Sequence, residues 1–194
     1  MVTVSTSNVE QRAYHHGDLR AALVAAGLRA LENTDIADIS LRGLAREVGV
    51  SATAVYRHFP DKRALLEAMA QDGLAQLGQL QQRAAMDAGD QAFSATGRAY
   101  VRFALANPGL FRLVFTHCQM RGDGLPEGNL AADMLLGNAA KFTGGDPAAA
   151  RRFAVQAWAL VHGLAMLMLD GQLPADEALI DQVIDGRSMW QARS

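Results

Sequence analysis

Apolar residues recur three and four positions apart along most of this 194-residue chain, and no stretch alternates regularly between apolar and polar residues. The first pattern is typical of helices with one buried face, whereas a half-buried strand requires the second. Half of the residues are hydrophobic, which is enough apolar surface for the helices to bury a core. The sequence therefore predicts an all-α protein.

Gly, Pro, Asn and Asp residues interrupt the helical pattern and set the expected helix boundaries. Four helices are expected in the first part of the chain, at about 18–31, 41–48, 52–59 and 61–83. Five more are expected at about 91–106, 108–120, 128–142, 147–170 and 175–190. Residues 1–13 are polar and have no apolar periodicity, which predicts a flexible N-terminal arm.

Segment 41–59 carries the signals of two short helices that are joined by a tight turn. Ser40 and Ser51 stand where each helix begins, and a serine there can accept a hydrogen bond from a free backbone N–H. Gly49 can adopt the positive φ of a tight turn, and Ala45 is small enough to let the two helices cross closely. This pattern predicts a helix-turn-helix, whose second helix enters the major groove of DNA.

The second helix of this motif has an expected buried side and an expected DNA-binding side. Val55 and Phe59 should face inward, which leaves the first turn of the helix free to meet bases and phosphates. Thr53 can contact a base edge, whereas Tyr56 and His58 suit phosphate oxygens. The candidate DNA contacts are Arg42, Ser51, Ala52, Thr53, Ala54, Tyr56, Arg57, His58 and Lys62.

Overall charge and the few reactive residues show which other functions, such as metal binding or catalysis, the sequence disfavours. The net charge of −2 neither supports nor excludes DNA binding, because a few well-placed cations can suffice. Cys118 is the only cysteine, so no intrachain disulfide and no cysteine-rich metal site is expected. His117 precedes it, but neighbouring residues of a helix point about 100° apart and do not form a catalytic pair. We expect no enzyme activity, no metal and no cofactor.

The ends and the apolar runs of the chain indicate where the protein works. The N-terminal residues contain no apolar leader segment, and the apolar run 158–169 is too short to span a bilayer. A cytoplasmic protein without a membrane segment is expected.

Residues 14–69 contain YHHGDLRAALVAAGLRAL and ISLRGLAREVGVSATAVYRHFPDKRALLEAM, and they resemble the N-terminal domain of TetR-family regulators. The resemblance implies DNA-contact roles for Arg42, for the turn through Ala54, and for Tyr56, Arg57, His58 and Lys62. Thr53 departs from the Gly or Pro of many relatives. Because that position helps to select the base, the operator sequence does not transfer.

Two later stretches, YVRFALANPGLFRLVF and WALVHGLAMLML, are similar to the TetR subgroup that is named for its WHG C-terminal domain. Trp158, His162 and Gly163 would be its signature. The resemblance implies a DNA-binding domain at 14–62 and a domain at 63–194 that binds a small molecule and forms a homodimer. The last two long helices, at 147–170 and 175–190, would then pair with their copies in the partner.

The aromatic and Met residues of the C-terminal part are candidates for an apolar effector pocket. They are Tyr100, Phe103, Phe111, Phe115, Met134, Phe142, Trp158, His162 and Met166. Ordinary core packing is the competing interpretation, above all for Phe103, Phe111 and Met134. His162 is four residues after Trp158 and shares its helix face, so it needs a hydrogen-bond partner in either case.

The resulting hypothesis is a repressor that binds a palindromic operator as a homodimer and releases it when an apolar effector binds. The alternatives are an activator, a regulator controlled by a protein partner, a nucleoid-type DNA binder without an effector, and an all-helical enzyme.

Overall fold

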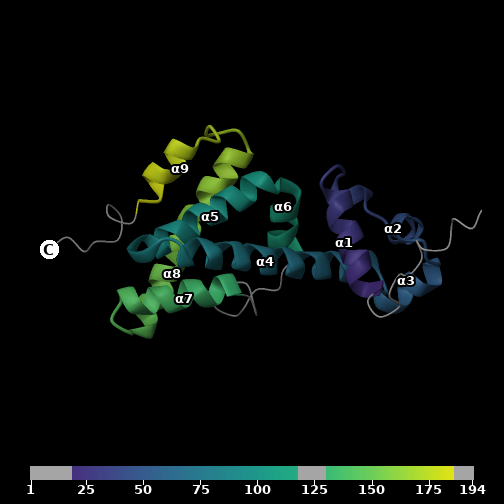
Figure 1. The fold of residues 1–194 in the computed structure, drawn as a ribbon, viewed down its shortest axis with the longest axis horizontal. Helices are drawn as coiled ribbons and strands as arrows, with labels where there is room; N and C mark the ends of the chain where they lie inside the picture. Colours follow the sequence, from purple (N-terminus) through teal and green to yellow (C-terminus); the bar gives the residue numbers. More distant parts are fainter. Residues whose placement is uncertain (1–18, 118–129, 186–194) are drawn as a thin grey trace, which may run out of the picture.

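A computed structural model describes residues 19–117 and 130–185, and within these ranges every regular element is a helix, as predicted (Figure 1). The N-terminal elements are α1 (Leu19–Leu31), the 3-10 turn η1 (Ile36–Asp38), α2 (Leu41–Val48) and α3 (Ala52–His58). Helix α4 (Lys62–Met86) leads from them into the larger C-terminal part. That part contains η2 (Gly89–Gln91), α5 (Ala92–Ala106), α6 (Pro108–His117), α7 (Leu130–Phe142), α8 (Pro147–Leu169) and α9 (Glu177–Val183).

The last helix differs from its prediction, because α9 covers only Glu177–Val183 of the expected 175–190. Asp176 caps its start by accepting a hydrogen bond from the N–H of Ala178, and Ile184 already has non-helical φ and ψ of −103° and 42°. Asp185 and Gly186 follow in the sequence, and both residue types have low helix propensity. Residues 186–190, the predicted arm 1–13 and residues 14–18 lie outside the described part of the chain.

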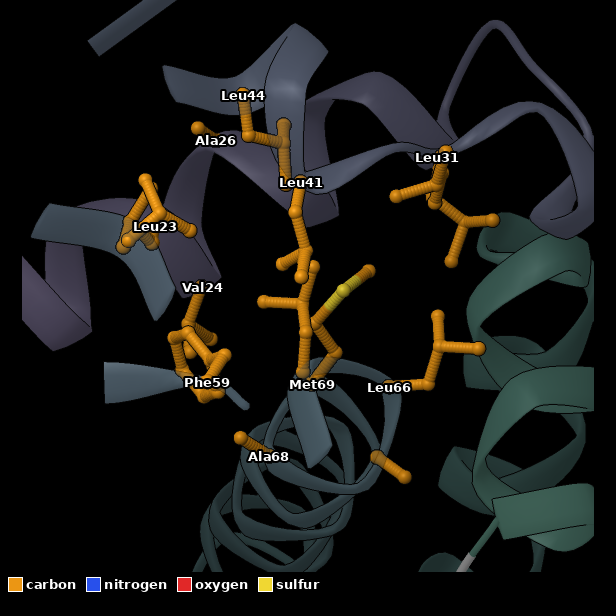
Figure 2. Close-up of a cluster of buried hydrophobic side chains, with 14 of the residues drawn as sticks. Leu23, Val24, Ala26, Leu31, Leu41, Leu44, Phe59, Leu66, Ala68 and Met69 are labelled. Carbon is orange, nitrogen blue, oxygen red and sulfur yellow. The ribbon is translucent and has the colours of Figure 1, made fainter. Parts of the chain in front are cut away.

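The N-terminal elements share one apolar core with the first half of α4 (Figure 2). Leu23 of α1, Val55 of α3 and Phe59 are at most 1% exposed and pack with Met69 of α4. A Cβ added to Gly27 would lie 2.7 Å from Sδ of Met69, so α1 and α4 approach closely at this glycine. The start of α4 is thus part of the N-terminal domain as well as its link to the rest.

A second core joins α4, α5, α6, α8 and α9. Helix α6 contributes to both cores, since Phe111 is fully buried in the second and Leu113 is fully buried in the first. A Cβ added to Gly109 would lie 3.3 Å from both the side chain and the carbonyl oxygen of Leu31 in α1. Helix α6 therefore packs directly between the two parts of the molecule.

Helix α8 has a face that the described part of the chain leaves uncovered. The apolar run 158–169 is only part of α8, which has 23 residues and is long and apolar enough to cross a membrane by length and composition. Length therefore does not exclude a membrane span, contrary to the expectation. One third of its most apolar window is buried, against α5 and α7, and Val155 and Leu167 remain about 40% exposed.

Candidate nucleic-acid interface and apolar cavity

Local hydrogen bonds build the helix-turn-helix as predicted. The hydroxyl of Ser40 accepts from the N–H of Gly43 at 3.1 Å, and the hydroxyl of Ser51 accepts from the N–H of Ala54 at 3.2 Å. Gly49 ends α2 with φ +76°, a left-handed conformation that a residue with a side chain adopts only at a cost. These contacts fix where α2 ends and where α3 begins.

Most of the candidate DNA-contact side chains lie on the surface. Val55 and Phe59 are buried as predicted, and burial of this side of α3 directs the other side outward. Tyr56 is 46% exposed and has no place in the core. The exposed candidates are Arg42, Ser51, Ala52, Thr53, Tyr56, Arg57 and His58, whereas Ala54 and Lys62 are half-buried.

The cations of this surface differ in their partners. Arg42, Arg46 and Arg57 form no ion pair with another residue in the ranges 19–117 and 130–185, whereas Arg29 pairs with Glu47 at 2.9 Å. Unpaired arginines on an exposed surface are free to meet phosphate oxygens without first breaking an internal contact.

Lys62 has a second role that sequence reasoning missed. Its Nζ donates a hydrogen bond to the carbonyl oxygen of Ala37 in η1 at 2.7 Å, which ties the start of α4 to the turn after α1. An ammonium group has three N–H donors, so two remain for an anion. The partner of Lys62 lies 25 residues away in the sequence, and no local pattern signals such a contact.

The C-terminal part contains a partly open cavity of about 70 Å³ between α4, α5, α6, α7 and α8. Its wall is almost entirely apolar, and no charged residue belongs to it. It is lined by Leu74, Leu77, Gln81, Phe93, Ser94, Thr96, Gly97, Tyr100, Phe115, Ala131, Ala132, Met134, Leu135, Ala157, Trp158, Leu160, Val161 and Ile184.

Only part of the predicted pocket belongs to this wall. Tyr100, Phe115, Met134 and Trp158 line the cavity, whereas Phe103, Phe111, His162 and Met166 do not. Phe103 and Phe111 are core residues, 5% and 0% exposed, because their sides of α5 and α6 face the second core. Phe142, the other pocket candidate, instead packs with the rings of Phe93 and Phe153 and is half exposed.

A chain of three polar groups lies beside the cavity. The indole N–H of Trp158 donates to the hydroxyl of Tyr100 at 3.2 Å, and the same hydroxyl lies 2.9 Å from Nδ1 of His162. Because an indole can only donate, satisfying all three groups requires the tyrosine proton to point to Nδ1, which leaves the proton of a neutral His162 on Nε2. Burial raises the pKa of the Tyr100 hydroxyl and lowers the pKa of His162, so both groups are held in the neutral forms that this chain needs.

Gln81 is the most informative wall residue that the sequence analysis missed. It is only 9% exposed, and its amide nitrogen donates to the carbonyl oxygen of Thr96 at 3.1 Å. A signal was available, because Gln81 follows Leu74 and Leu77 at helical spacing and therefore stands on the apolar face of α4.

Two matches to known families cover most of the chain. Residues 23–69 match the family described as bacterial regulatory proteins, tetR family, and residues 93–186 match a tetracycline-repressor-like C-terminal domain. This chain belongs to the TetR family. The N-terminal match includes α2, α3 and the start of α4, so the helix-turn-helix is the DNA-binding element of a TetR-family transcriptional regulator.

Individual relatives agree with this assignment. An uncharacterized HTH-type transcriptional regulator from Haemophilus influenzae is 34% identical over 106 residues, which cover 53% of this chain and 52% of the relative. The chain thus spans about half the length, or less, of the curated relatives that it matches. These families and relatives are regulators and not enzymes, as the sequence predicted.

Solved structures share the fold over nearly the whole chain. A protein of unknown function from Rhodococcus sp. RHA1 has 32% sequence identity and a TM-score of 0.71, and the match covers 90% of this chain and 93% of the other. TetR from Acinetobacter baumannii AYE has 18% identity and a TM-score of 0.57, with 86% of this chain and 95% of that chain covered. The second likeness shows the fold alone.

Proposed function

We propose that this TetR-family regulator is a repressor that binds a palindromic operator as a homodimer and leaves it when a small, mostly apolar effector fills the cavity. The observation that carries the proposal is the position of α6, which forms part of the cavity wall through Phe115 and part of the N-terminal core through Leu113. A ligand that displaces Phe115 acts on the same helix that packs against the DNA-binding domain.

The DNA-binding surface supports a two-site mode of binding. Helix α3 has seven residues, about 10 Å of helix, and can reach only a few base pairs. Two copies of such a helix reading half-sites about 34 Å apart bind with far higher affinity than one. The proposed contacts are Arg42, Tyr56, Arg57, His58 and Lys62, together with the exposed first turn of α3.

The uncovered face of α8 supports the homodimer. Val155 and Leu167 are exposed apolar residues on this helix, and a Cβ added to Gly163 would meet nothing within 4 Å. A second copy would remove this apolar surface from water, which is the main driving force of association. Since α9 has only two turns, α8 contributes the larger share of the interface among the described residues.

Release of DNA requires that the effector distinguish two arrangements of the dimer. A ligand shifts an equilibrium only by its difference in affinity for the two states, so the effector must bind the arrangement with misplaced α3 helices more tightly. Helix α4, which starts in the N-terminal core and borders the cavity at Leu74, Leu77 and Gln81, transmits the change together with α6.

Two finer assignments belong to the same proposal. We place the protein in the WHG subgroup, because Trp158 and His162 of that signature are joined through the hydroxyl of Tyr100. We also place it in the cytoplasm, where a regulator of transcription meets DNA in bacteria. An activator, or a regulator whose signal is a protein, is the alternative function.

Selection of a binding sequence tests the proposal. Random duplexes are enriched on the purified protein, and the selected duplex is titrated by fluorescence anisotropy at physiological salt against wild type, Tyr56→Ala and Met86→Ala. Met86 is 78% exposed at the far end of α4 and serves as the matched control. We expect an inverted repeat and weaker binding for Tyr56→Ala alone. Enrichment of no sequence, or equal binding by the three proteins, would contradict the proposal.

A promoter fusion that carries the selected duplex then separates repressor from activator. Reporter output that rises when the protein is removed supports repression, and output that falls supports the alternative.

A further inference from the structure

The amide oxygen of Gln81 is a buried acceptor without a partner. Among the described residues, Oε1 of Gln81 and Nδ1 of His117 are the buried side-chain atoms that make no hydrogen bond. A buried polar atom without a partner costs free energy, and in native proteins such atoms are rare unless a ligand or a water molecule binds there. Gln81 differs from His117 in one respect, because it forms part of the cavity wall.

The contact with Thr96 determines which end of the amide is free. Nε2 of Gln81 donates to the carbonyl oxygen of Thr96 at 3.1 Å, and a flipped amide would place two oxygen atoms against each other. The nitrogen is therefore the end that is bound to the protein. The amide atom that remains without any partner is the oxygen, an acceptor, which can be satisfied only by a donor.

The rest of the wall excludes charged partners. No lysine, arginine, histidine, aspartate or glutamate lines the cavity within the described residues, so an anion or a cation would lose its hydration without gaining an opposite charge. An anion would in addition meet the negative end of the Gln81 amide. The wall thus favours neutral molecules.

We propose that the effector is a small, neutral and largely apolar molecule with one O–H or N–H group, which donates a hydrogen bond to Oε1 of Gln81. This inference rests on the proposed effector role of the cavity. In the empty protein a water molecule can serve the same acceptor, and the effector's donor group replaces it.

The cavity as it stands is smaller than one that holds a single ring. A cavity of about 150 Å³ holds benzene, and this one measures about 70 Å³, so a ring enters only when wall side chains move. Met134 is the wall residue most able to do so, because its unbranched side chain has three rotatable bonds. Such movement of the wall is also what the release of DNA requires.

Phenol and toluene test the proposal as a matched pair of probes, and benzoate is added as a charged probe. Phenol and toluene have the same number of non-hydrogen atoms and differ in the donor, and benzoate carries a negative charge. Each is titrated into the full chain labelled with ¹⁵N, and the indole N–H signal of Trp158, a wall residue, reports binding at this site. The chain has two tryptophans, Trp158 and Trp190. The variant Trp190→Phe keeps only the indole signal of Trp158 and so assigns it.

The matched variants are Gln81→Leu and Gln82→Leu, since Gln82 is the exposed neighbour of Gln81 on α4. We expect wild type and Gln82→Leu to bind phenol about tenfold more tightly than toluene and to bind benzoate most weakly. Gln81→Leu should bind phenol and toluene equally. Should Gln81→Leu fail to fold, Gln81→Met keeps the side-chain length and removes the same acceptor.

The outcomes separate this inference from the proposed function. Equal affinity of wild type for phenol and toluene, or a preference for phenol that persists without Gln81, would overturn the proposed hydrogen bond from the effector to Gln81. The cavity would still be a ligand-binding site. If neither phenol nor toluene shifts the indole N–H signal of Trp158, the proposed hydrogen bond to Gln81 and the effector role of the cavity are both overturned. Selection of an operator does not depend on either result.

Discussion

The hydroxyl of Tyr100 and Nδ1 of His162 lie 2.9 Å apart and form a hydrogen bond that connects α5 with α8. Tyr100 lines the cavity, whereas His162 stands on the helix whose outer face we propose as the dimer interface. With the tyrosine as donor the bond needs a neutral His162, because a protonated ring could only donate to the hydroxyl oxygen and would leave the tyrosine proton without this acceptor. On the proposed function, we therefore expect protonation of His162 to disturb the cavity wall at Tyr100.

Stability should fall in mildly acidic solution because of His162. Burial lowers the pKa of His162 in the folded protein below the value of about 6.5 in the unfolded chain. The unfolded chain thus binds the proton more readily, so the stabilisation is complete above pH 6.5 and is lost as the pH falls from there to the folded pKa. Thermal unfolding between pH 5.5 and 7.5 should show this decline, and His162→Gln should flatten it. An equal decline in both proteins would contradict the assignment.

Arg57→Ala should weaken binding to the selected duplex and reduce its dependence on salt. Each phosphate contact that is lost lowers the slope of log K against log salt concentration by about 1. Titrations between 50 and roughly 200 mM salt measure that slope. Arg83→Ala, at the end of α4 remote from the helix-turn-helix, is the control and should leave the slope unchanged. A slope that does not change for Arg57→Ala would remove this residue from the proposed contacts.

Gly49→Ala should destabilise the protein by about 1 kcal/mol, because an L-residue with a side chain adopts the left-handed conformation only at a cost. Gly137→Ala is the matched control within helix α7. It has no positive φ, and an added Cβ would meet nothing within 4 Å, so it should stabilise the protein by about 0.5 kcal/mol. Urea unfolding measures both, and changes of the same sign would contradict this account of Gly49.

Leu113→Ala should lower the free energy of unfolding by roughly 2–5 kcal/mol, because it leaves a cavity where α6 enters the N-terminal core. Thr116→Ala, an exposed position of the same helix, should change it by less than about 0.5 kcal/mol. Because α6 is proposed to transmit the effector signal, Leu113→Ala should also uncouple duplex affinity from ligand. A variant that folds and still releases DNA on ligand addition would contradict that role.

Val155→Glu should shift the protein from dimer to monomer, because it places a charge in the proposed α8 interface. Light scattering after size-exclusion chromatography measures the mass. Met86→Glu adds the same charge at an exposed site at the end of α4 and should remain dimeric. Wild type that elutes as a monomer would contradict the homodimer itself.

The helix-turn-helix could be predicted from the sequence because its determinants act over a few residues. Ser40, Gly49 and Ser51 bind backbone groups that lie three or four positions away, and Val55 and Phe59 follow from the period of the helix. The predicted end of α9 was too late, since apolar spacing continues weakly past Val183 and was given more weight than the low helix propensity of Asp185 and Gly186.

Tertiary structure determines which residues line the cavity. Helical periodicity places Phe111 and Phe115 on α6 equally well for core or pocket, and which of them faces the cavity depends on how α4, α5 and α8 pack around that helix. Gln81, Phe93 and Ile184 meet at one wall from three distant segments, and no local spacing encodes their meeting. The sequence alone thus determined the DNA-binding motif, whose contacts are local, whereas long-range packing determined the cavity and left Oε1 of Gln81 in its wall without a partner among the described residues.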